Sequence, residues 1–216
     1  MSAPPARRVV LWRHGRTEWN AAGRFQGQSD IELDDAGRAQ AERAARLLAA
    51  LWPTLLVSSD LRRAHDTASA LARLTGLEVE TDPDLREIYA GRFQGLLGAE
   101  IAERFPEDHA RWREGDPLEP VGGGETRLEV AERVARAVER VAARLPEDGL
   151  AVLATHGGAA RLGIARLIGL PVEHFGSLGV LSNCSWSMLA EDRSGGWQLV
   201  EHNAGTLPEP VELVEG

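Results

Sequence analysis

Two short apolar runs of this chain each end in a histidine that is followed by a glycine. The first run, residues 9–12, leads into Arg13 and His14, and the second, residues 150–155, leads into His156. Continuous apolar runs are typical of strands that a parallel sheet buries on both faces. Because such sheets bind ligands beyond the carboxyl ends of their strands, the two histidines are expected to share one crevice. Arg13 makes that crevice attractive to an anion.

Amphipathic stretches alternate with apolar runs along most of the chain. We expect strands near residues 9–12, 54–57, 77–80, 150–155, 185–189 and 197–201, and helices over about 34–51, 59–74, 125–145 and 158–168. Alternation of strands and helices favours parallel pairing with right-handed crossovers. The sequence therefore predicts an α/β fold with three layers, α/β/α, in which helices flank a mostly parallel sheet.

Residues 82–124 do not follow this alternation. They are rich in glycine, proline and charged side chains, with short helical patterns near residues 99–104 and 108–113. Segments of this length without sheet structure usually carry a function when they interrupt a compact chain. We therefore expect one domain over residues 1–216, in which residues 82–124 form a cap insertion over the crevice and set the choice of substrate.

The charge and the cysteine content narrow the classes of partner. The net charge is -9, which disfavours nucleic acid because such binding relies on a broad basic surface. No stretch approaches the roughly 20 apolar residues of a membrane helix, and residues 1–8 leave no room for a signal-peptide core. The single cysteine, Cys184, excludes an internal disulfide and suits a reducing compartment. We expect a cytoplasmic protein with neither a nucleic-acid nor a membrane partner.

Lysine is absent, and all 24 basic residues are arginine. The P-loop and Schiff-base chemistry both require a lysine, so neither is available to this chain. Any bound phosphate must be held by arginine, histidine and backbone N–H groups. The planar guanidinium suits this task because it can donate two parallel hydrogen bonds to phosphate oxygens.

Polar residues follow each of the three main predicted strands. They are Arg13 and His14 after the first strand, Ser58, Ser59 and Arg62 after the second, and His156 after the third. Gly157 lets the backbone approach a ligand closely, and the helix that follows directs its positive end at an anion. Arg62 is expected to bind phosphate, whereas its neighbour Arg63 is expected to be an ordinary charge on a helix surface.

These side chains suit phosphoryl transfer through a histidine. A neutral His14 can attack phosphorus to form a phosphohistidine, while Arg13, Arg62 and His156 stabilise the charge on the transferring oxygens. The sequence has no His-x-His or Cys-x-x-Cys spacing, so we expect neither a metal nor a cofactor.

The leaving alkoxide of such a reaction needs a proton. A nearby carboxylic acid that is protonated before the step can supply it as a general acid. Glu18, Asp30 and Glu87 are candidates, and their positions in the sequence do not choose among them.

Six short blocks of this sequence occur in the order that is typical of one enzyme family. They are LWRHGRTEWN at 11–20, GQSDIEL at 27–33, SSDLRRA at 58–64, LRE at 85–87, GGET at 123–126 and THGG at 155–158. Together they resemble the signature of the histidine phosphatase superfamily, the phosphoglycerate mutase-like fold. The resemblance implies a mixed, mostly parallel sheet flanked by helices, and an enzyme that needs no metal.

The resemblance also implies roles for individual residues. His14 is the implied nucleophile and Glu87 the implied proton donor, which selects one of the candidate acids. The implied phosphate pocket comprises Arg13, Arg62 and His156, with Asn20 and Gln26 at its mouth.

The branch of the family is indicated by what the chain lacks. Mutases that depend on bisphosphoglycerate carry a longer, lysine-containing insertion after the glutamate block, whereas residues 88–96 are short and lysine-free. This favours a phosphomonoesterase for a small phosphorylated metabolite, namely an anionic sugar or glycerate phosphate. Phosphoglycerate mutase, a broad-specificity acid phosphatase, a metal-dependent hydrolase and a non-catalytic phosphate-binding module are the alternatives. The resemblance further implies a homodimer, in which the late strands can pair across a twofold axis.

Overall fold

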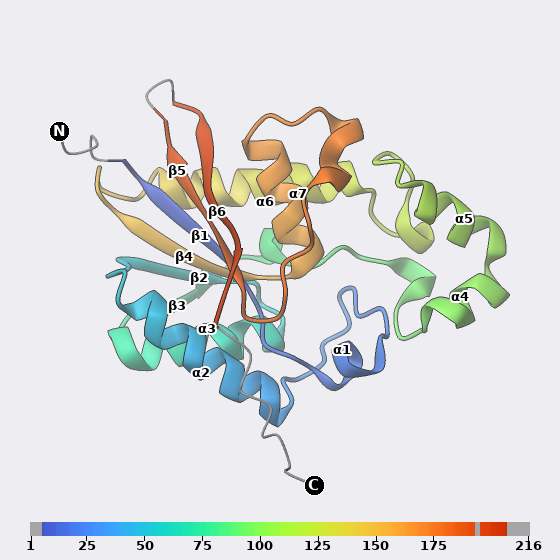
Figure 1. The fold of residues 1–216 in the computed structure, drawn as a ribbon, viewed down its shortest axis with the longest axis horizontal. Helices are drawn as coiled ribbons and strands as arrows, with labels where there is room; N and C mark the ends of the chain where they lie inside the picture. The colour runs from blue at the N-terminus through green and yellow to red at the C-terminus, as the bar shows by residue number, and fades with distance from the viewer. Residues whose placement is uncertain (1–5, 193–194, 207–216) are drawn as a thin grey trace, which may run out of the picture.

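A six-stranded sheet forms the centre of the computed structural model, which describes residues 6–192 and 195–206 (Figure 1). The strands are β1 (Arg8–Arg13), β2 (Leu55–Ser58), β3 (Val79–Thr81), β4 (Leu150–Thr155), β5 (Trp186–Glu191) and β6 (Trp197–Ala204), in the order β3-β2-β4-β1-β5-β6. The first four in this order run parallel, and β5 and β6 are antiparallel to their neighbours. The predicted mostly parallel sheet is confirmed. Residues 1–5, part of the segment expected to hold no signal-peptide core, lie outside the described residues.

Helices cover both faces of the sheet (Figure 1). They are α2 (Asp35–Ala49) and α3 (Arg62–Thr75) on one face, and α6 (Arg127–Ala142) and α7 (Gly157–Leu167) on the other. Successive side chains of β1 alternate between the two resulting cores, since Val10 and Trp12 pack with α2 and α3 while Val9 and Leu11 pack with α6 and α7. The predicted α/β/α layering is therefore confirmed.

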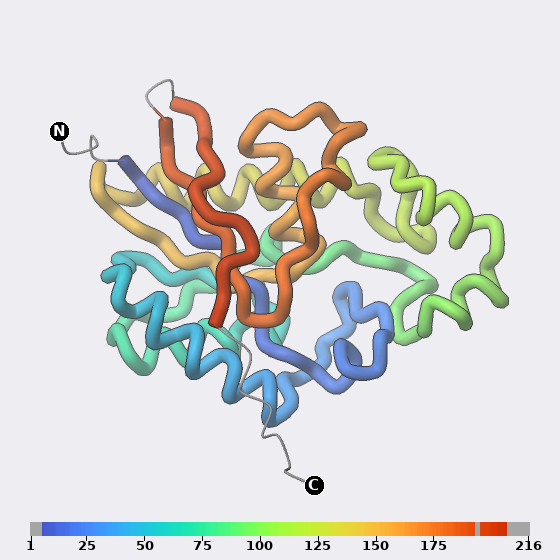
Figure 2. Tube along the Cα trace, in the orientation of Figure 1, coloured from blue at the N-terminus to red at the C-terminus, as the bar shows by residue number. Residues whose placement is uncertain are grey.

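The segment from residue 82 to 124 begins against the sheet, where the Thr155 hydroxyl donates to the carbonyl of Leu85, and its residues 98–114 lie to one side of the sheet, light green in Figure 2. It contains the short 3-10 turns η1 (Pro83–Leu85), η2 (Gly91–Phe93) and η3 (Val121–Gly123), and the helices α4 (Gly98–Arg104) and α5 (Pro106–Glu114). A small separate core of Ala90, Phe93, Ile101 and Val121 holds the segment together. The expected helical pieces are present, and no strand of the described chain lies within these residues.

Three local features differ from the sequence prediction. A short helix, α1 (Glu18–Ala22), and the 3-10 segment η4 (Val172–Ser177) were not expected. Helix α3 begins at Arg62 rather than near residue 59, and its N-cap residue Leu61 makes no side-chain capping bond. In the described part of the chain, no helix has the length and apolar character needed to cross a membrane.

Candidate active site

The pairing of β1 with β4 brings two histidines together at one edge of the sheet. Arg13 lies opposite Thr155 in the register, and the backbone N–H of His14 donates to the carbonyl of Thr155 at 3.0 Å. The rings of His14 and His156 meet edge to face with their centroids 5.1 Å apart. Both rings are buried, at 3% and 0% exposure. The strand ends thus deliver two histidines to one place.

His14 is arranged as a nucleophile. Its Nδ1 lies 2.7 Å from the carbonyl oxygen of Gly15, and since a carbonyl only accepts, Nδ1 carries the hydrogen. Burial holds the pKa of His14 well below its usual range, and the positive charges of Arg63 and Arg13 lower it further. The ring is therefore neutral, and its lone pair is on Nε2, which has no hydrogen-bond partner among the described residues.

His156 serves the site from behind His14. Nε of Arg63 donates to Nδ1 of His156 at 3.2 Å, and Nε2 of His156 lies 2.9 Å from the hydroxyl oxygen of Ser59. Burial, followed by the charge of Arg63, holds the pKa of His156 well below its usual range. A neutral ring that accepts at Nδ1 must donate from Nε2, so His156 joins Arg63 to the end of β2.

Arg63 occupies the place that the sequence analysis gave to Arg62. Arg63 is fully buried, and it also donates to the carbonyl oxygens of Gly27 and Ser29, each at 2.7 Å. Burial lowers its pKa to about 10, so the guanidinium remains charged at neutral pH. The charge of Glu87 opposes this shift.

Arg62 points away from the histidines, so its assignment to the phosphate pocket is corrected. Its side chain is 55% exposed and pairs with Glu32 at 2.7 Å and with Asp30 at 3.4 Å. Consecutive residues of a helix point about 100° apart, so only one of two adjacent arginines can face the sheet. The signal was available in the sequence, because Arg63 shares the buried helix stripe with Thr67 and Ala70.

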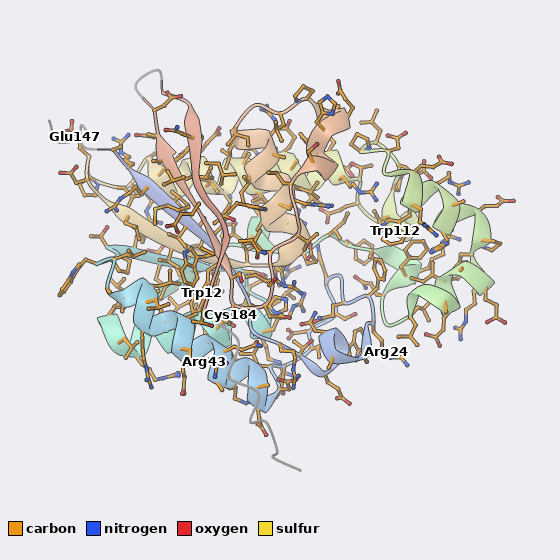
Figure 3. All side chains as sticks on the ribbon, in the orientation of Figure 1. Trp12, Arg24, Arg43, Trp112, Glu147 and Cys184 are labelled. Atoms are coloured by element: carbon orange, nitrogen blue, oxygen red, sulfur yellow. The ribbon has the colours of Figure 1, made fainter. Side chains whose placement is uncertain are left out.

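A hollow of about 250 Å³ opens in front of His14. It is lined by Arg13, His14, Asn20, Arg24, Phe25, Gln26, Gly27, Arg63, Glu87, Ile88, Trp112, Gly158 and Val180. Arg24, from the segment after α1, and Trp112, from α5, are labelled in Figure 3. The structure thus brings Arg13, Asn20, Gln26 and Glu87 of the predicted residues to the hollow.

Several polar atoms at the hollow have no partner in the described part of the chain. Nε of Arg13 and the side-chain oxygen of Gln26 are both buried without a hydrogen bond. Arg13 also donates from Nη1 to the carbonyl of Leu181, and its pKa is lowered by burial against the opposing charge of Glu87. Buried polar atoms of this kind favour a polar ligand, because leaving them unpaired costs free energy.

Glu87 lies at the N-terminus of α7 and lines the hollow together with Arg63. Its two carboxylate oxygens accept the backbone N–H groups of Gly158 at 3.0 Å and Ala159 at 2.9 Å. A side chain at position 158 would place its Cβ 2.8 Å from the carboxylate, so only glycine admits Glu87 this closely. Of the candidate acids, Glu18 is exposed and Asp30 pairs with Arg62, which leaves Glu87 at the hollow.

Sequence reasoning missed two residues that hold this machinery in place. Arg133 of α6 donates to the backbone carbonyls of Asp84, Arg86 and Glu87, and so fixes the loop that carries the carboxylate. Asn183 donates to the backbone carbonyl of His14 at 3.1 Å and to the side-chain oxygen of Asn20 at 3.2 Å. The sequence assigned a role to neither residue, because only the folded chain brings them to the site.

Gly157 does not line the hollow but packs against it. A Cβ at this position would lie 3.2 Å from the Cδ and Nε atoms of Arg13 and 2.8 Å from Val180. Glycine therefore lets the arginine side chain lie flat on the start of α7. Among the described residues, no three His, Cys, Asp or Glu side chains form a group that could hold a metal ion.

A buried neutral imidazole, one buried and one half-buried guanidinium group and a carboxylate together define the site of an enzyme that acts on phosphate esters. The model of the histidine phosphatase superfamily (branch 1) matches residues 9–205. The chain belongs to this superfamily, and it is a hydrolase of phosphate monoesters.

Two relatives and one solved structure illustrate the similarity. The chain is 44% identical over 199 residues to a glucosyl-3-phosphoglycerate phosphatase of Mycobacterium tuberculosis, which covers 89% of this chain and 87% of the relative. It is 41% identical over 180 residues to a metal-independent phosphoserine phosphatase of Arabidopsis thaliana, covering 82% and 73%. A mycobacterial glucosyl-3-phosphoglycerate phosphatase in complex with VO3 superposes with a TM-score of 0.86 at 44% identity, covering 93% of this chain and 100% of that chain.

The adjacent arginines provide a matched pair of substitutions. We expect Arg63→Gln to lower kcat/KM for 4-nitrophenyl phosphate by about 10²–10³-fold, as removal of a charge-stabilising donor does elsewhere. Arg62→Gln should stay within about threefold, because an exposed ion pair contributes little. Thermal unfolding of both variants controls for misfolding. Equal losses in the two variants would contradict the placement of Arg63.

Stability should fall as the pH drops below the usual histidine range. The unfolded chain binds protons near pH 6.5, whereas His14 and His156 stay neutral in the native state until their lowered pKa values are reached. Each histidine therefore costs up to about 1.4 kcal/mol of unfolding free energy per pH unit within that window. Urea unfolding between about pH 6.5 and 5.5 measures the slope. His156→Asn should make the slope shallower, and an unchanged slope would refute this assignment.

Proposed function

We propose that the chain is a metal-independent phosphomonoesterase that passes the phosphoryl group of its substrate to Nε2 of His14 and then to water. One observation carries the proposal. The Gly15 carbonyl fixes the hydrogen of His14 on Nδ1, and the unpartnered Nε2 belongs to a buried neutral ring that lines the hollow together with Arg13 and Arg63. A lone pair held beside two cations suits attack on an anionic phosphorus centre.

In the first step, Nε2 of His14 forms a bond to phosphorus while the ester P–O bond breaks. Arg13 and Arg63 stabilise the negative charge of the equatorial oxygens. Glu87, protonated at the start of the step, gives its proton to the leaving alkoxide. Its Oε2 accepts a single backbone N–H, from Gly158, which leaves that oxygen able to carry and release the proton.

In the second step, water replaces the alcohol. The Glu87 carboxylate takes a proton from the water, whose oxygen bonds to phosphorus as the P–N bond to His14 breaks. Inorganic phosphate leaves, the imidazole regains its lone pair and Glu87 regains its proton. His156 does not line the hollow, and we assign it to holding Arg63 and stabilising the positive charge that His14 acquires through its neutral ring.

The proposed substrates are small anionic sugar or glycerate phosphates, with glucosyl-3-phosphoglycerate as the first candidate. The relative from Mycobacterium tuberculosis that bears this substrate in its name supports the choice at 44% identity over most of both chains. The absence of lysine disfavours the alternative of a phosphoglycerate mutase, which must hold a second phosphate. Broad phosphomonoesterase activity is the remaining alternative, and a turnover panel of these compounds separates the two.

We further propose that residues 82–124 act as a cap over the hollow within a single domain. Ile88 and Trp112, which line the hollow, come from this segment and support the proposal.

A homodimer formed through the late strands is proposed because β6 lies at the edge of the sheet. A cytoplasmic location is proposed because the chain has a single cysteine, Cys184, which is buried and suits a reducing compartment.

The phosphohistidine can be trapped directly. Rapid quenching of the enzyme with a phosphorus-labelled phosphomonoester should leave label that is stable to base, labile to acid and confined to the peptide that holds His14. His14→Ala should incorporate no label and lose turnover. Full turnover by His14→Ala would overturn the proposed mechanism, and label elsewhere would move the nucleophile.

The proton donor can be tested through the leaving group. Glu87→Gln should slow alkyl phosphates by about 10²–10⁴-fold, because an alkoxide must be protonated as it leaves. Compared as kcat/KM, which reports transfer to His14 and not the later attack of water, nitrophenyl phosphate should lose far less, since nitrophenolate leaves without a proton. Glu18→Gln, which changes an exposed candidate acid, is the matched control and should behave as the native enzyme. Equal losses for both leaving groups would contradict the acid role of Glu87.

A further inference from the structure

A second cavity, of about 580 Å³, adjoins the catalytic hollow. Both spaces are lined by Phe25, Ile88, Trp112, Gly158 and Val180. Beyond these shared residues the second cavity extends over α7, the end of α5 and η4. A substrate whose phosphate lies at His14 therefore has room for its remaining atoms in this second cavity.

Arg161 of α7 lines the second cavity without a protein partner. Its Nε atom is buried with no hydrogen bond, and the described residues offer the guanidinium no hydrogen bond and no ion pair. Burial lowers the pKa of Arg161, and the charge of Glu87 opposes this shift. A partly buried, unpaired cation costs free energy, and an anionic ligand in the cavity removes that cost.

Arg127 adds a second positive charge to the same cavity. It donates to the backbone carbonyls of Trp112 at 2.8 Å and Asp116 at 2.9 Å, which fixes its guanidinium. Arg127 and Arg161 line the same cavity, and after burial the charge of Arg161 is the next cause that lowers the pKa of Arg127. Two adjacent guanidinium groups repel one another unless an anion lies between them.

The acidic residues of the cavity do not supply that anion. Glu114 and Glu173 line it, but both are exposed, and neither forms an ion pair with Arg161 or Arg127 in the described chain. A third arginine, Arg113, lines the cavity but is exposed, and the remaining lining is largely apolar, with Phe25, Leu162 and Phe175 among its members. Such a cavity favours a carbon skeleton that carries one anionic group.

We propose that Arg161, supported by Arg127, binds a carboxylate of the substrate and selects phosphomonoesters that carry one. The inference rests on the proposed function and names the substrate class of that site. Arg161 lies three residues after Gly158 and so on the same helix face, roughly 5 Å further along the helix axis. The planar guanidinium matches a carboxylate with two parallel hydrogen bonds.

A pair of matched substrates tests the proposal. 3-Phosphoglycerate and glycerol 3-phosphate share a three-carbon phosphomonoester, and a carboxylate in the first replaces a hydroxymethyl group in the second. Arg161→Gln should raise KM for 3-phosphoglycerate by about 10- to 100-fold with a smaller change in kcat, as expected for one charged hydrogen-bonded contact. Glycerol 3-phosphate should change by less than about threefold, because it makes no such contact.

Two further variants distinguish recognition from folding. Arg166→Gln removes an exposed arginine of the same helix, one that pairs with Glu132 at 2.7 Å, and should leave both substrates unaffected. Arg161→Lys keeps the charge and should recover part of the preference for the carboxylate. Equal losses on both substrates with Arg161→Gln, or no loss on 3-phosphoglycerate, would overturn the proposal.

Binding separates this inference from the proposed reaction. Calorimetric dissociation constants of the two compounds can be compared in His14→Ala and in His14→Ala combined with Arg161→Gln, neither of which needs to turn over. A preference for 3-phosphoglycerate that disappears with Arg161→Gln supports the carboxylate site even where turnover fails. An unchanged preference for 3-phosphoglycerate refutes the carboxylate site, whether or not the enzyme hydrolyses either compound.

Discussion

The parallel pairing of β1 with β4 is the contact on which the rest of the site depends. All six residues of β4 are buried, and side chains of β1 enter the core on both faces of the sheet. A slip of one residue would exchange the two faces, so the apolar core fixes the register. That register places His14 beside Thr155 and hence beside His156. Hydrophobic burial thus brings the two histidines together, and hydrogen bonds to Gly15, Arg63 and Ser59 orient their rings.

Two arginines at the hollow influence what the histidines can do. Burial, followed by the charges of Arg63 and Arg13, lowers the pKa of His14 and so keeps the imidazole neutral, as a nucleophile must be. Burial lowers the pKa of Arg63 only to about 10, so its charge persists. A lysine buried to this extent would be far closer to losing its proton, since buried lysines shift by several units. A site built from arginine alone therefore suits a lysine-free chain.

The sequence predicted the sheet and the convergence of the strand ends because both follow from apolar runs of residues 9–12 and 150–155. It misplaced Arg62 because neighbouring arginines differ only in helix phase, and the loop of Asp30 and Glu32 draws one of them outward. Thr67 and Ala70 lie on the buried face of the helix, and their spacing from Arg63 indicates that Arg63 lies on this face too. The role of Arg133 could not be predicted from the sequence, because the hydrogen bonds from its side chain to the Glu87 loop join residues 46 to 49 positions apart.

Helix α7 links the chemistry to the choice of substrate. Its first N–H groups hold the Glu87 carboxylate, and one turn later Arg161 lines the adjoining cavity. Both functions therefore depend on the same helix, which packs tightly on α6, where a Cβ on Gly163 would lie 2.3 Å from Val134. Two arginines of α6 also take part. Arg133 donates to the backbone carbonyl of Glu87, and Arg127 lines the second cavity. A shift of α7 against α6 would disturb proton transfer and recognition together, so this packing ties the rate of the enzyme to its selectivity.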